Sequence, residues 1–292
     1  MRIIILAGSE GWHVGDLRRA AQTLGLEVVT ADFCGLSARL GGAALGEGDL
    51  PGATTGLSPG DRLLVRSMPG GSLEQVVFRM DVLQRLEASG VRVVNRSRAL
   101  EAAIDKYLSL ARLEAAGLPV PETFVSEQTA GALEAFERLG GDVVMKPIFG
   151  SEGRGLERLT SPALASERCA ALEAAGSVIY LQRFVRHPGH DYRILVLGGE
   201  VLCGMRRAAT ASWITNVARG ATPLPLDVTP ELASLAVRAA AALGAEVAGV
   251  DILPDADGRL WVLEVNGVPG WRALAQVTGI DVAARILEQV AA

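Results

Sequence analysis

Three oxygen-bearing side chains lie close to the carboxyl end of the chain, inside segments that are otherwise apolar. Asp251 belongs to GVDIL, and Glu264 and Asn266 stand two residues apart in WVLEVNGVPGW. Successive residues of a strand point to opposite faces, so Glu264 and Asn266 share one face. Acidic side chains in apolar strands are uncommon unless they are paired. A donor set of oxygens without His or Cys suits a hard cation, and it predicts a site for Mg²⁺ or Mn²⁺.

The two segments must form a hairpin for these groups to meet. A turn at Ala256-Asp257 with Leu253 opposite Leu260 brings Asp251 within about one residue of facing Glu264. A structural carboxylate pair, or a solvent-facing polar stripe on a half-buried sheet, would explain the same residues without a metal.

A second group of residues is typical of phosphate binding. Lys146 ends the apolar run VVMKP, and the glycine-rich loop from Gly150 to Gly155 follows it, with Ser151 and Gly153 inside. Glycine lets backbone N–H groups approach phosphate oxygens, and a lysine adds a point charge. The loop is not a Walker A motif, because GSEGRG lacks the terminal Gly-Lys-Ser/Thr. An ordinary glycine-rich turn is the alternative.

Arginines gather in one stretch of the sequence, and an asparagine follows in ITNVARGA. The residues are Arg193, Arg206, Arg207, Asn216 and Arg219. Guanidinium groups match planar oxyanions, so this stretch suits phosphate or carboxylate recognition. Arg206 and Arg207 are adjacent on a predicted strand, so at most one of them points at any given site. A solvated charged face is the alternative for each arginine taken singly.

The elements that position these groups change in kind along the chain. Short apolar runs alternate with helical patterns over about the first 95 residues, which predicts a parallel α/β domain. The expected strands are 2–7, 26–30, 62–65 and 91–94, the expected helices 16–24 and 73–89, and 41–60 an irregular segment. After residue 95, the strands occur as hairpins with helices on one side, which predicts an α+β arrangement. Helices are expected at 98–116, 129–139 and 229–243, and strands at 143–147, 178–185, 192–196, 200–206, 247–253 and 259–265.

The order of these elements resembles the ATP-grasp ligases, specifically the RimK-like ATP-dependent glutamate ligases. The likeness runs through AIDKYLSLARLEAAGLPVPET, VVMKPIFGSEGRG, YLQRFV, GHDYRILVLGGEVLCGMRR, ITNVARGA, AGVDIL and WVLEVNGVPGW. It implies a Rossmann-like domain preceding an ATP-grasp fold of two subdomains. The expected boundaries are 1–95 for the first domain, 96–184 for the subdomain with the phosphate flap, and 185–292 for the subdomain with the metal site.

The resemblance also implies roles for individual residues. ATP contacts are expected from Lys106, Lys146, Gly150, Ser151, Gly153, Gly155, Gln182, Arg183, Phe184, Val185, Asp191, Thr215 and Asn216. Within this set, 150–155 would form the flap, 182–185 the adenine hinge, and Asp191 a ribose contact. Arg193 and Arg206 are expected in catalysis, and Asp251, Glu264 and Asn266 at Mg²⁺. The family often has an acidic residue where Arg183 stands, which puts one contact to adenine or ribose in doubt.

The chemistry implied is amide formation through an acyl phosphate, with an amino acid such as glutamate as the amine. The acceptor carboxylate would be a peptide, a protein C-terminus or a small cofactor. The segments VRSMPGGSLEQVVFRMDVL and EVNGVPGWRALAQVTG resemble ligases that act on tetrahydromethanopterin-type pterins. Two alternatives differ in class: an ATP-binding module without ligase activity, and an ATP-grasp enzyme that activates a different carboxylate.

Composition limits the partners. The chain has 292 residues, a net charge of −5 and 49% hydrophobic residues. A weakly acidic chain is a poor candidate for nucleic-acid binding through a broad basic face. No apolar run approaches the length of a membrane span, and three separated cysteines make no disulfide framework, so we expect a cytoplasmic protein. A homo-oligomer is compatible with the sequence.

Overall fold

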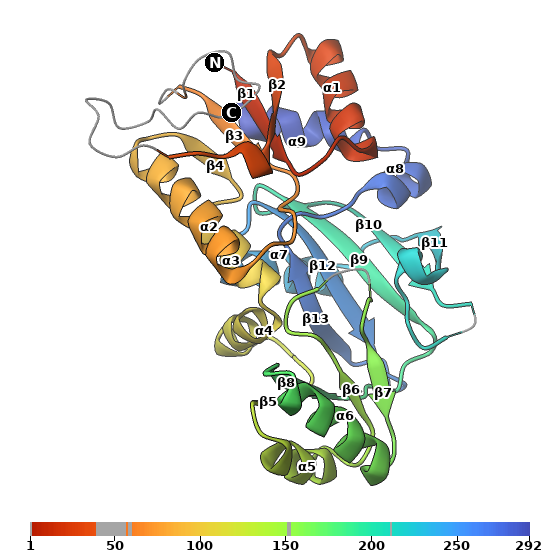
Figure 1. Ribbon diagram of the computed structural model, residues 1–292. Helices are drawn as coiled ribbons and strands as arrows, with labels where there is room; N and C mark the ends of the chain where they lie inside the picture. The colour runs from red at the N-terminus through yellow and green to blue at the C-terminus, as the bar shows by residue number, and fades with distance from the viewer. Residues whose placement is uncertain (1, 39–56, 58–59, 151–152, 211) are drawn as a thin grey trace.

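A computed structural model describes residues 2–38, 57, 60–150, 153–210 and 212–292. Most of the segment 41–60, predicted to be irregular, lies outside the described residues. The described chain forms three sheets, stacked from the N-terminal end of the molecule to the opposite end (Figure 1). None of the helices in these residues is both long and apolar enough to span a bilayer.

The first sheet confirms the predicted parallel α/β pattern. Its strands are β1 (Ile3–Ala7), β2 (Val28–Asp32), β3 (Arg62–Val65) and β4 (Arg92–Val94), in the order β2-β1-β3-β4. The helices are α1 (Trp12–Leu24), α2 (Leu73–Ala88) and a 3₁₀ turn (Phe33–Gly35). β1 is buried on both faces, as the β-branched run predicts, because α1 packs on one face and α2 on the other. Gly25, with φ of 65°, ends α1 in the left-handed region.

The second sheet is small and has the order β5-β8-β6-β7. Its strands are β5 (Thr123–Ser126), β6 (Val143–Met145), β7 (Glu157–Leu159) and β8 (Ile179–Arg183), and its helices α5 (Thr129–Arg138) and α6 (Pro162–Ala174). Helix α6 was not predicted, although Ser161 caps it and Pro162 occupies its first turn. The single helix expected over 98–116 is two helices, α3 (Ser97–Ile104) and α4 (Lys106–Ala115). They separate at Asp105, whose carboxylate accepts hydrogen bonds from the amides of Tyr107 and Leu108.

The third sheet is antiparallel, in the order β11-β10-β9-β12-β13. Its strands are β9 (His190–Leu197), β10 (Glu200–Ala208), β11 (Thr222–Pro225), β12 (Val247–Pro254) and β13 (Leu260–Asn266). Helix α7 (Pro230–Leu243) covers one face, and helices α8 (Arg272–Thr278) and α9 (Val282–Ala291) cover part of the other. The expectation of helices on one side only is therefore wrong for this sheet.

Two β-bulges alter the strand pairing that a simple hairpin would have. In β10 the register shifts between Val201 and Cys203, and in the β12–β13 pair it shifts beside Asp251. The predicted pairing of Leu253 with Leu260 is wrong by one residue, because Leu253 faces Trp261. The second bulge shifts the register by one further residue, and Asp251 lies directly opposite Glu264.

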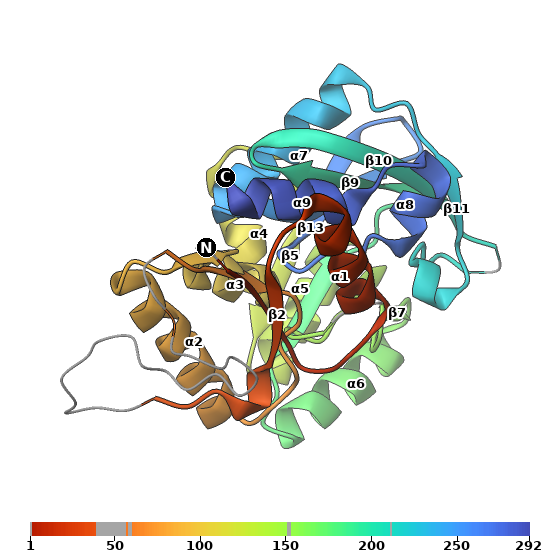
Figure 2. The same ribbon diagram turned by 90° about the horizontal axis from the view of Figure 1, so that it is seen from above.

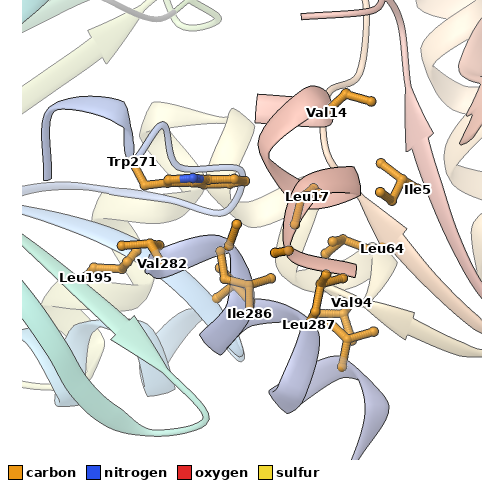
Figure 3. Close-up of a cluster of buried hydrophobic side chains, with 14 of the residues drawn as sticks. Ile5, Val14, Leu17, Leu64, Val94, Leu195, Trp271, Val282, Ile286 and Leu287 are labelled. Carbon is orange, nitrogen blue, oxygen red and sulfur yellow. The ribbon is translucent and has the colours of Figure 1, made fainter. Parts of the chain in front are cut away.

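The last helix joins the two ends of the chain. α9 packs beside α1 and against β3, as Figures 1 and 2 both show. In Figure 3, Ile286 and Leu287 of α9 lie among Leu17, Leu64 and Val94 of the first sheet and its helix. The three sheets fall within 3–94, 123–183 and 190–266. The domain boundaries themselves stay a prediction, and α9 belongs to the first sheet by its packing.

One buried amide also ties the first sheet to the third. The side chain of Asn95 donates to the carbonyl oxygens of Val247 and Gly267 at 2.7 and 2.6 Å. Its Oδ1 accepts from the amides of Glu246 and Val247 at 2.7 and 2.9 Å. All the hydrogen-bonding groups of this side chain are satisfied, so it fixes the segment after β13 relative to β4.

Candidate active site

A cleft lined by residues of both sheets lies between the second and third sheets. It brings together most of the residues that the sequence singled out. Those on its walls are Lys106, Lys146, Gly150, Gly153, Gln182, Arg183, Phe184, Val185, Asp191, Thr215, Asn216, Asp251 and Glu264. Gly155, Arg193, Arg206 and Asn266 are not among the lining residues, and Ser151 lies outside the described residues.

Two lysines provide positive charge in the cleft. The ammonium group of Lys146 donates to Gln182 Oε1 at 2.7 Å, and Gln182 in turn donates to Thr123 at 2.9 Å. Burial lowers the pKa of Lys146 to about 8, although the nearby Glu264 carboxylate opposes this shift. Lys106 donates to the carbonyl oxygen of Gly150 at 2.7 Å, and burial lowers its pKa as well. Gln182 therefore positions Lys146 with its side chain, which leaves the backbone of the following hinge residues for a base.

The glycine-rich loop needs its glycines for backbone conformation and for space. Gly153 and Gly155 have φ values of 68° and 73°, in the left-handed region that disfavours other residues. A Cβ on Gly153 would lie 2.8 Å from Asn216 Oδ1. Asn216 belongs to the segment before β11 of the third sheet. The part of the loop at Gly153, which follows β6 of the second sheet, therefore packs against the third sheet.

The floor of the cleft is a network of two acids and two arginines on β9, β10 and β12. Arg193 forms a two-pronged ion pair with Asp251, one contact of which is 2.8 Å. Arg207 bridges Asp191, at 2.7 and 2.5 Å, and Asp251, at 2.9 Å. The hydroxyl of Thr215 also donates to Asp191. All four charged side chains are buried, so the network is a rigid charged surface beneath the cleft.

Burial and ion pairing shift the pKa values of Asp191 and Asp251 in opposite directions. Burial raises the pKa of Asp191 against the opposing effect of Arg207. For Asp251, burial acts in the same direction, but Arg193 and Arg207 together hold its pKa below the ordinary value. Asp251 therefore stays ionised.

The structure corrects the choice of arginine. Arg206 lies opposite Tyr192, is exposed and points to the face of the sheet away from the cleft. Arg207 takes the expected place, directly opposite Asp191. Without the bulge after Val201, Arg206 would be the partner of Asp191, so the sequence alone pointed to the wrong neighbour.

The chemistry of the acidic residues fits a divalent cation. Glu264 is partly buried opposite Asp251 and has no hydrogen-bond or ion-pair partner among the described residues. Asn266 lies two residues further along, and its Oδ1 accepts from the Val268 amide at 2.9 Å. Within the described part of the chain, no three His, Cys, Asp or Glu side chains gather into a site. A bound cation would thus use two carboxylates, an amide and oxygens of the nucleotide.

Aromatic residues that the sequence did not single out line the end of the cleft near the hinge. Trp213 meets the ring of Phe184 edge-on at 5.7 Å between centroids, and His187 lies 5.9 Å from the same ring. Arg158 stacks on Phe184 at 3.6 Å. Arg183, the departure from the family pattern, is exposed and pairs with Glu122, which immediately precedes β5. The rings of Phe184 and Trp213 suit a planar base.

Solved structures of ATP-grasp ligases share the whole fold. The ligase PsnB, in complex with a minimal precursor, superposes with a TM-score of 0.78 at 23% identity, covering 99% of this chain and 98% of PsnB. A RimK domain protein from Sphaerobacter thermophilus superposes with a TM-score of 0.76 at 24% identity over the full length of both chains. At these identities the similarity establishes the fold, including the domain that precedes the ATP-grasp part.

Sequence comparison defines the family. Residues 103–290 match the RimK-like ATP-grasp domain, so the chain belongs to the RimK-like ATP-grasp family. Among its relatives is a tetrahydromethanopterin:alpha-L-glutamate ligase of Methanosarcina acetivorans, 35% identical over 80% of both chains. The same-named ligase of Methanocaldococcus jannaschii is 34% identical over 73% of this chain and 74% of its own. An alpha-aminoadipate–LysW ligase of Saccharolobus solfataricus is 32% identical over 70% of this chain and 76% of its own.

This membership confirms the predicted class of enzyme. The chain is an ATP-dependent ligase that joins a carboxylate to an amine.

Proposed function

We propose that this enzyme adds L-glutamate to a carboxylate of a tetrahydromethanopterin-type pterin, using ATP and Mg²⁺ or Mn²⁺. The observation that carries the proposal is the cleft itself. Lys106, Lys146 and the glycine-rich loop stand on one side, and Glu264 and Asp251 stand on the other. The relatives from Methanosarcina and Methanocaldococcus support this choice of acceptor and amine.

The reaction follows from the charges on the walls. An acceptor carboxylate oxygen bonds to the γ-phosphorus of ATP while the bond to ADP breaks, which gives an acyl phosphate. The glutamate nitrogen then bonds to the acyl carbon, phosphate leaves, and the amine loses a proton to solvent. Lys146 and Lys106 would hold the phosphates in the first step, and the guanidinium of Arg207 would offset negative charge from the floor.

Asp251, Glu264 and Asn266 would hold a divalent ion. The ion would neutralise part of the negative charge on the phosphates. The adenine would lie against the backbone of 183–185, beside Phe184 and Trp213. Water would be kept from the acyl phosphate by closure of the glycine-rich loop toward Asn216.

The direct test is a product mass spectrum. The protein is incubated with ATP, Mg²⁺, L-glutamate and reduced tetrahydromethanopterin, and we expect a pterin product heavier by one or more glutamyl residues. ADP should appear in equal amount to the amide bonds formed. Omitting either glutamate or the pterin should abolish the product.

The acceptor panel should also contain a peptide ending in glutamate and a LysW-type carrier protein, because one relative is named for a LysW substrate. Transfer to one of these and not to the pterin would keep the ligase class and overturn the pterin acceptor. Consumption of ATP without any amide product would overturn the proposal as a whole.

A further inference from the structure

Arg66 is a cation without a carboxylate partner among the described residues. It follows β3 directly, is partly buried, and its Nε is shielded from solvent with no hydrogen-bond acceptor. Its Nη1 donates only a long bond of 3.4 Å, to the carbonyl oxygen of Val268. The guanidinium stacks on Trp271 at 4.8 Å, and burial lowers its pKa to about 10. A charge kept in such a place costs stability unless a ligand compensates for it.

The position of Arg66 in the sheet is one where ligands bind. The chain runs from β1 through α1 to β2 on one side and from β3 through α2 to β4 on the other. The carboxyl ends of β1 and β3 therefore form the topological switch point, the crevice that open parallel sheets use for ligands. Arg66 stands at this point because it follows the last residue of β3.

One carboxylate lies near Arg66: Asp16 of α1 accepts a hydrogen bond from Trp271 Nε1 at 2.9 Å and forms no ion pair with Arg66. Helix α1 begins beside it, with no side-chain cap at Gly11 and no acidic residue in its first turn. In that first turn, the Nε2 atom of His13 accepts a hydrogen bond from the Trp271 amide at 3.2 Å. Burial and the charge of Arg66 lower the His13 pKa to about 4, so at neutral pH the ring is uncharged and carries its proton on Nδ1. The guanidinium of Arg66, the N-terminus of α1, the neutral ring of His13 and the carboxylate of Asp16 thus lie around one tryptophan.

The segment 267–271 connects this place to the active site. It follows directly on β13, which carries Glu264 and Asn266. A Cβ on Gly249 would lie 2.7 Å from Arg193 Nη1 and 2.9 Å from Pro269, so the segment packs over Arg193 on one side. Its Val268 and Trp271 contact Arg66 on the other. The segment 267–271 thus lies between Arg193, in the charged network under the cleft, and Arg66.

We propose that Arg66 binds a carboxylate of a substrate that does not take part in the reaction, and so selects acidic substrates. The inference rests on the proposed function, in which L-glutamate and the pterin acceptor both carry carboxylates. A guanidinium fork matches a carboxylate with two parallel hydrogen bonds, and Arg66 has N–H groups free for them. The carboxylate belongs either to the incoming amino acid or to the acceptor.

Binding is tested first, without turnover. Titration calorimetry measures L-glutamate, and separately tetrahydromethanopterin, binding to the protein saturated with Mg²⁺ and a non-hydrolysable ATP analogue. Arg66→Gln should weaken one of the two ligands by roughly 10- to 100-fold, as loss of hydrogen bonds to a charged group does. Arg98→Gln, which changes an exposed arginine on α3, should match the wild type. A wild-type protein that binds neither ligand, or an Arg66→Gln protein that binds both like the wild type, overturns the inference.

Kinetics then assign the carboxylate to its source. In Arg66→Gln, a raised KM for glutamate alone places the amino acid at Arg66, and a raised KM for the acceptor alone places the acceptor there. The Kd of the ATP analogue should not change, since Arg66 is not among the residues that line the cleft. A loss confined to kcat, with both KM values within about twofold of the wild type, indicates a structural role and overturns the inference.

The failure of the proposed function has a separate signature, because it shows in the wild-type protein as no amide product with any acceptor. The two-ligand calorimetry still tests Arg66 in that case. If Arg66→Gln does not fold, Arg66→Lys keeps the charge without the planar fork, and it should weaken the same ligand by a smaller factor.

Discussion

At the scale of single residues, Glu264 gives the most direct test of the metal site, because its carboxylate pairs with no other described side chain. Glu264→Gln should lower kcat by at least about 100-fold, since a divalent ion contributes several kcal/mol to phosphate-charge stabilisation. The fold should survive, as the amide has the same shape. Steady-state assays with circular dichroism test this, and Glu200→Gln at the exposed start of β10 is the control. A Glu264→Gln enzyme with wild-type turnover would remove this residue from the metal site.

Lys146 gives the enzyme a dependence on pH. Its pKa is lowered to about 8 by burial, so the free protein holds this lysine neutral above that pH. Phosphate binding favours the charged form, and the Kd for ATP should therefore rise above pH 8, by up to about tenfold per pH unit. Calorimetry from pH 7 to pH 10 measures the slope. Lys146→Arg, which stays charged, should show a flat profile, and a wild-type profile as flat as that of the variant would contradict the assignment.

The same lysine affects folding in the opposite direction. Between about pH 8 and its ordinary pKa of 10.5, the unfolded chain binds a proton at this position and the folded protein does not. The contribution of Lys146 to stability therefore increases as the pH rises through this window. A higher pH thus relieves the cost of a buried charge while it removes the charge that ATP needs.

At the scale of elements, the bulge in β10 decides which arginine faces the cleft. Arg207→Gln should cost about 3–5 kcal/mol of unfolding free energy, because it leaves Asp191 and Asp251 short of a buried partner. It should also reduce kcat. Arg206→Gln, one residue away on the exposed face, should stay within about 0.5 kcal/mol of the wild type. Urea unfolding and steady-state rates compare the two variants, and equal effects would mean that the bulge does not set the function.

The bulges also mark what sequence reasoning could and could not reach. The alternation of apolar residues predicted β9, β10, β12 and β13, and the glycine pair at 198–199 predicted the hairpin turn. Position 264 could be placed near Asp251 by counting from a turn. The pairing of Leu253 depends on the length of the turn after Pro254, which the sequence did not fix. A bulge adds one residue without any clear signal in the sequence, so the choice of Arg207 could not be derived either. The roles of Trp213 and Asn95 depend on contacts between distant segments, which local patterns do not contain.

At the scale of the whole molecule, the cluster between α9 and the first sheet makes the two ends of the chain one cooperative unit. Ile286 is 1% exposed within this cluster (Figure 3). Ile286→Ala should cost about 2–5 kcal/mol and lower the melting temperature of a single shared transition. Arg285→Ala, on the exposed side of the same helix, should cost at most about 1 kcal/mol. Calorimetry that resolves an independent transition of residues 2–95 would contradict this coupling.

The docking of α9 has a practical consequence for building hybrid enzymes. To exchange substrate preference between this ligase and a relative, an engineer would naturally replace the N-terminal portion alone. The grafted portion would have to pack against an α9 of different sequence. It would also need an asparagine at the position of Asn95 to donate a hydrogen bond to the Gly267 carbonyl oxygen. The transferable module is therefore discontinuous: residues up to about 96 together with those from about 272 onward.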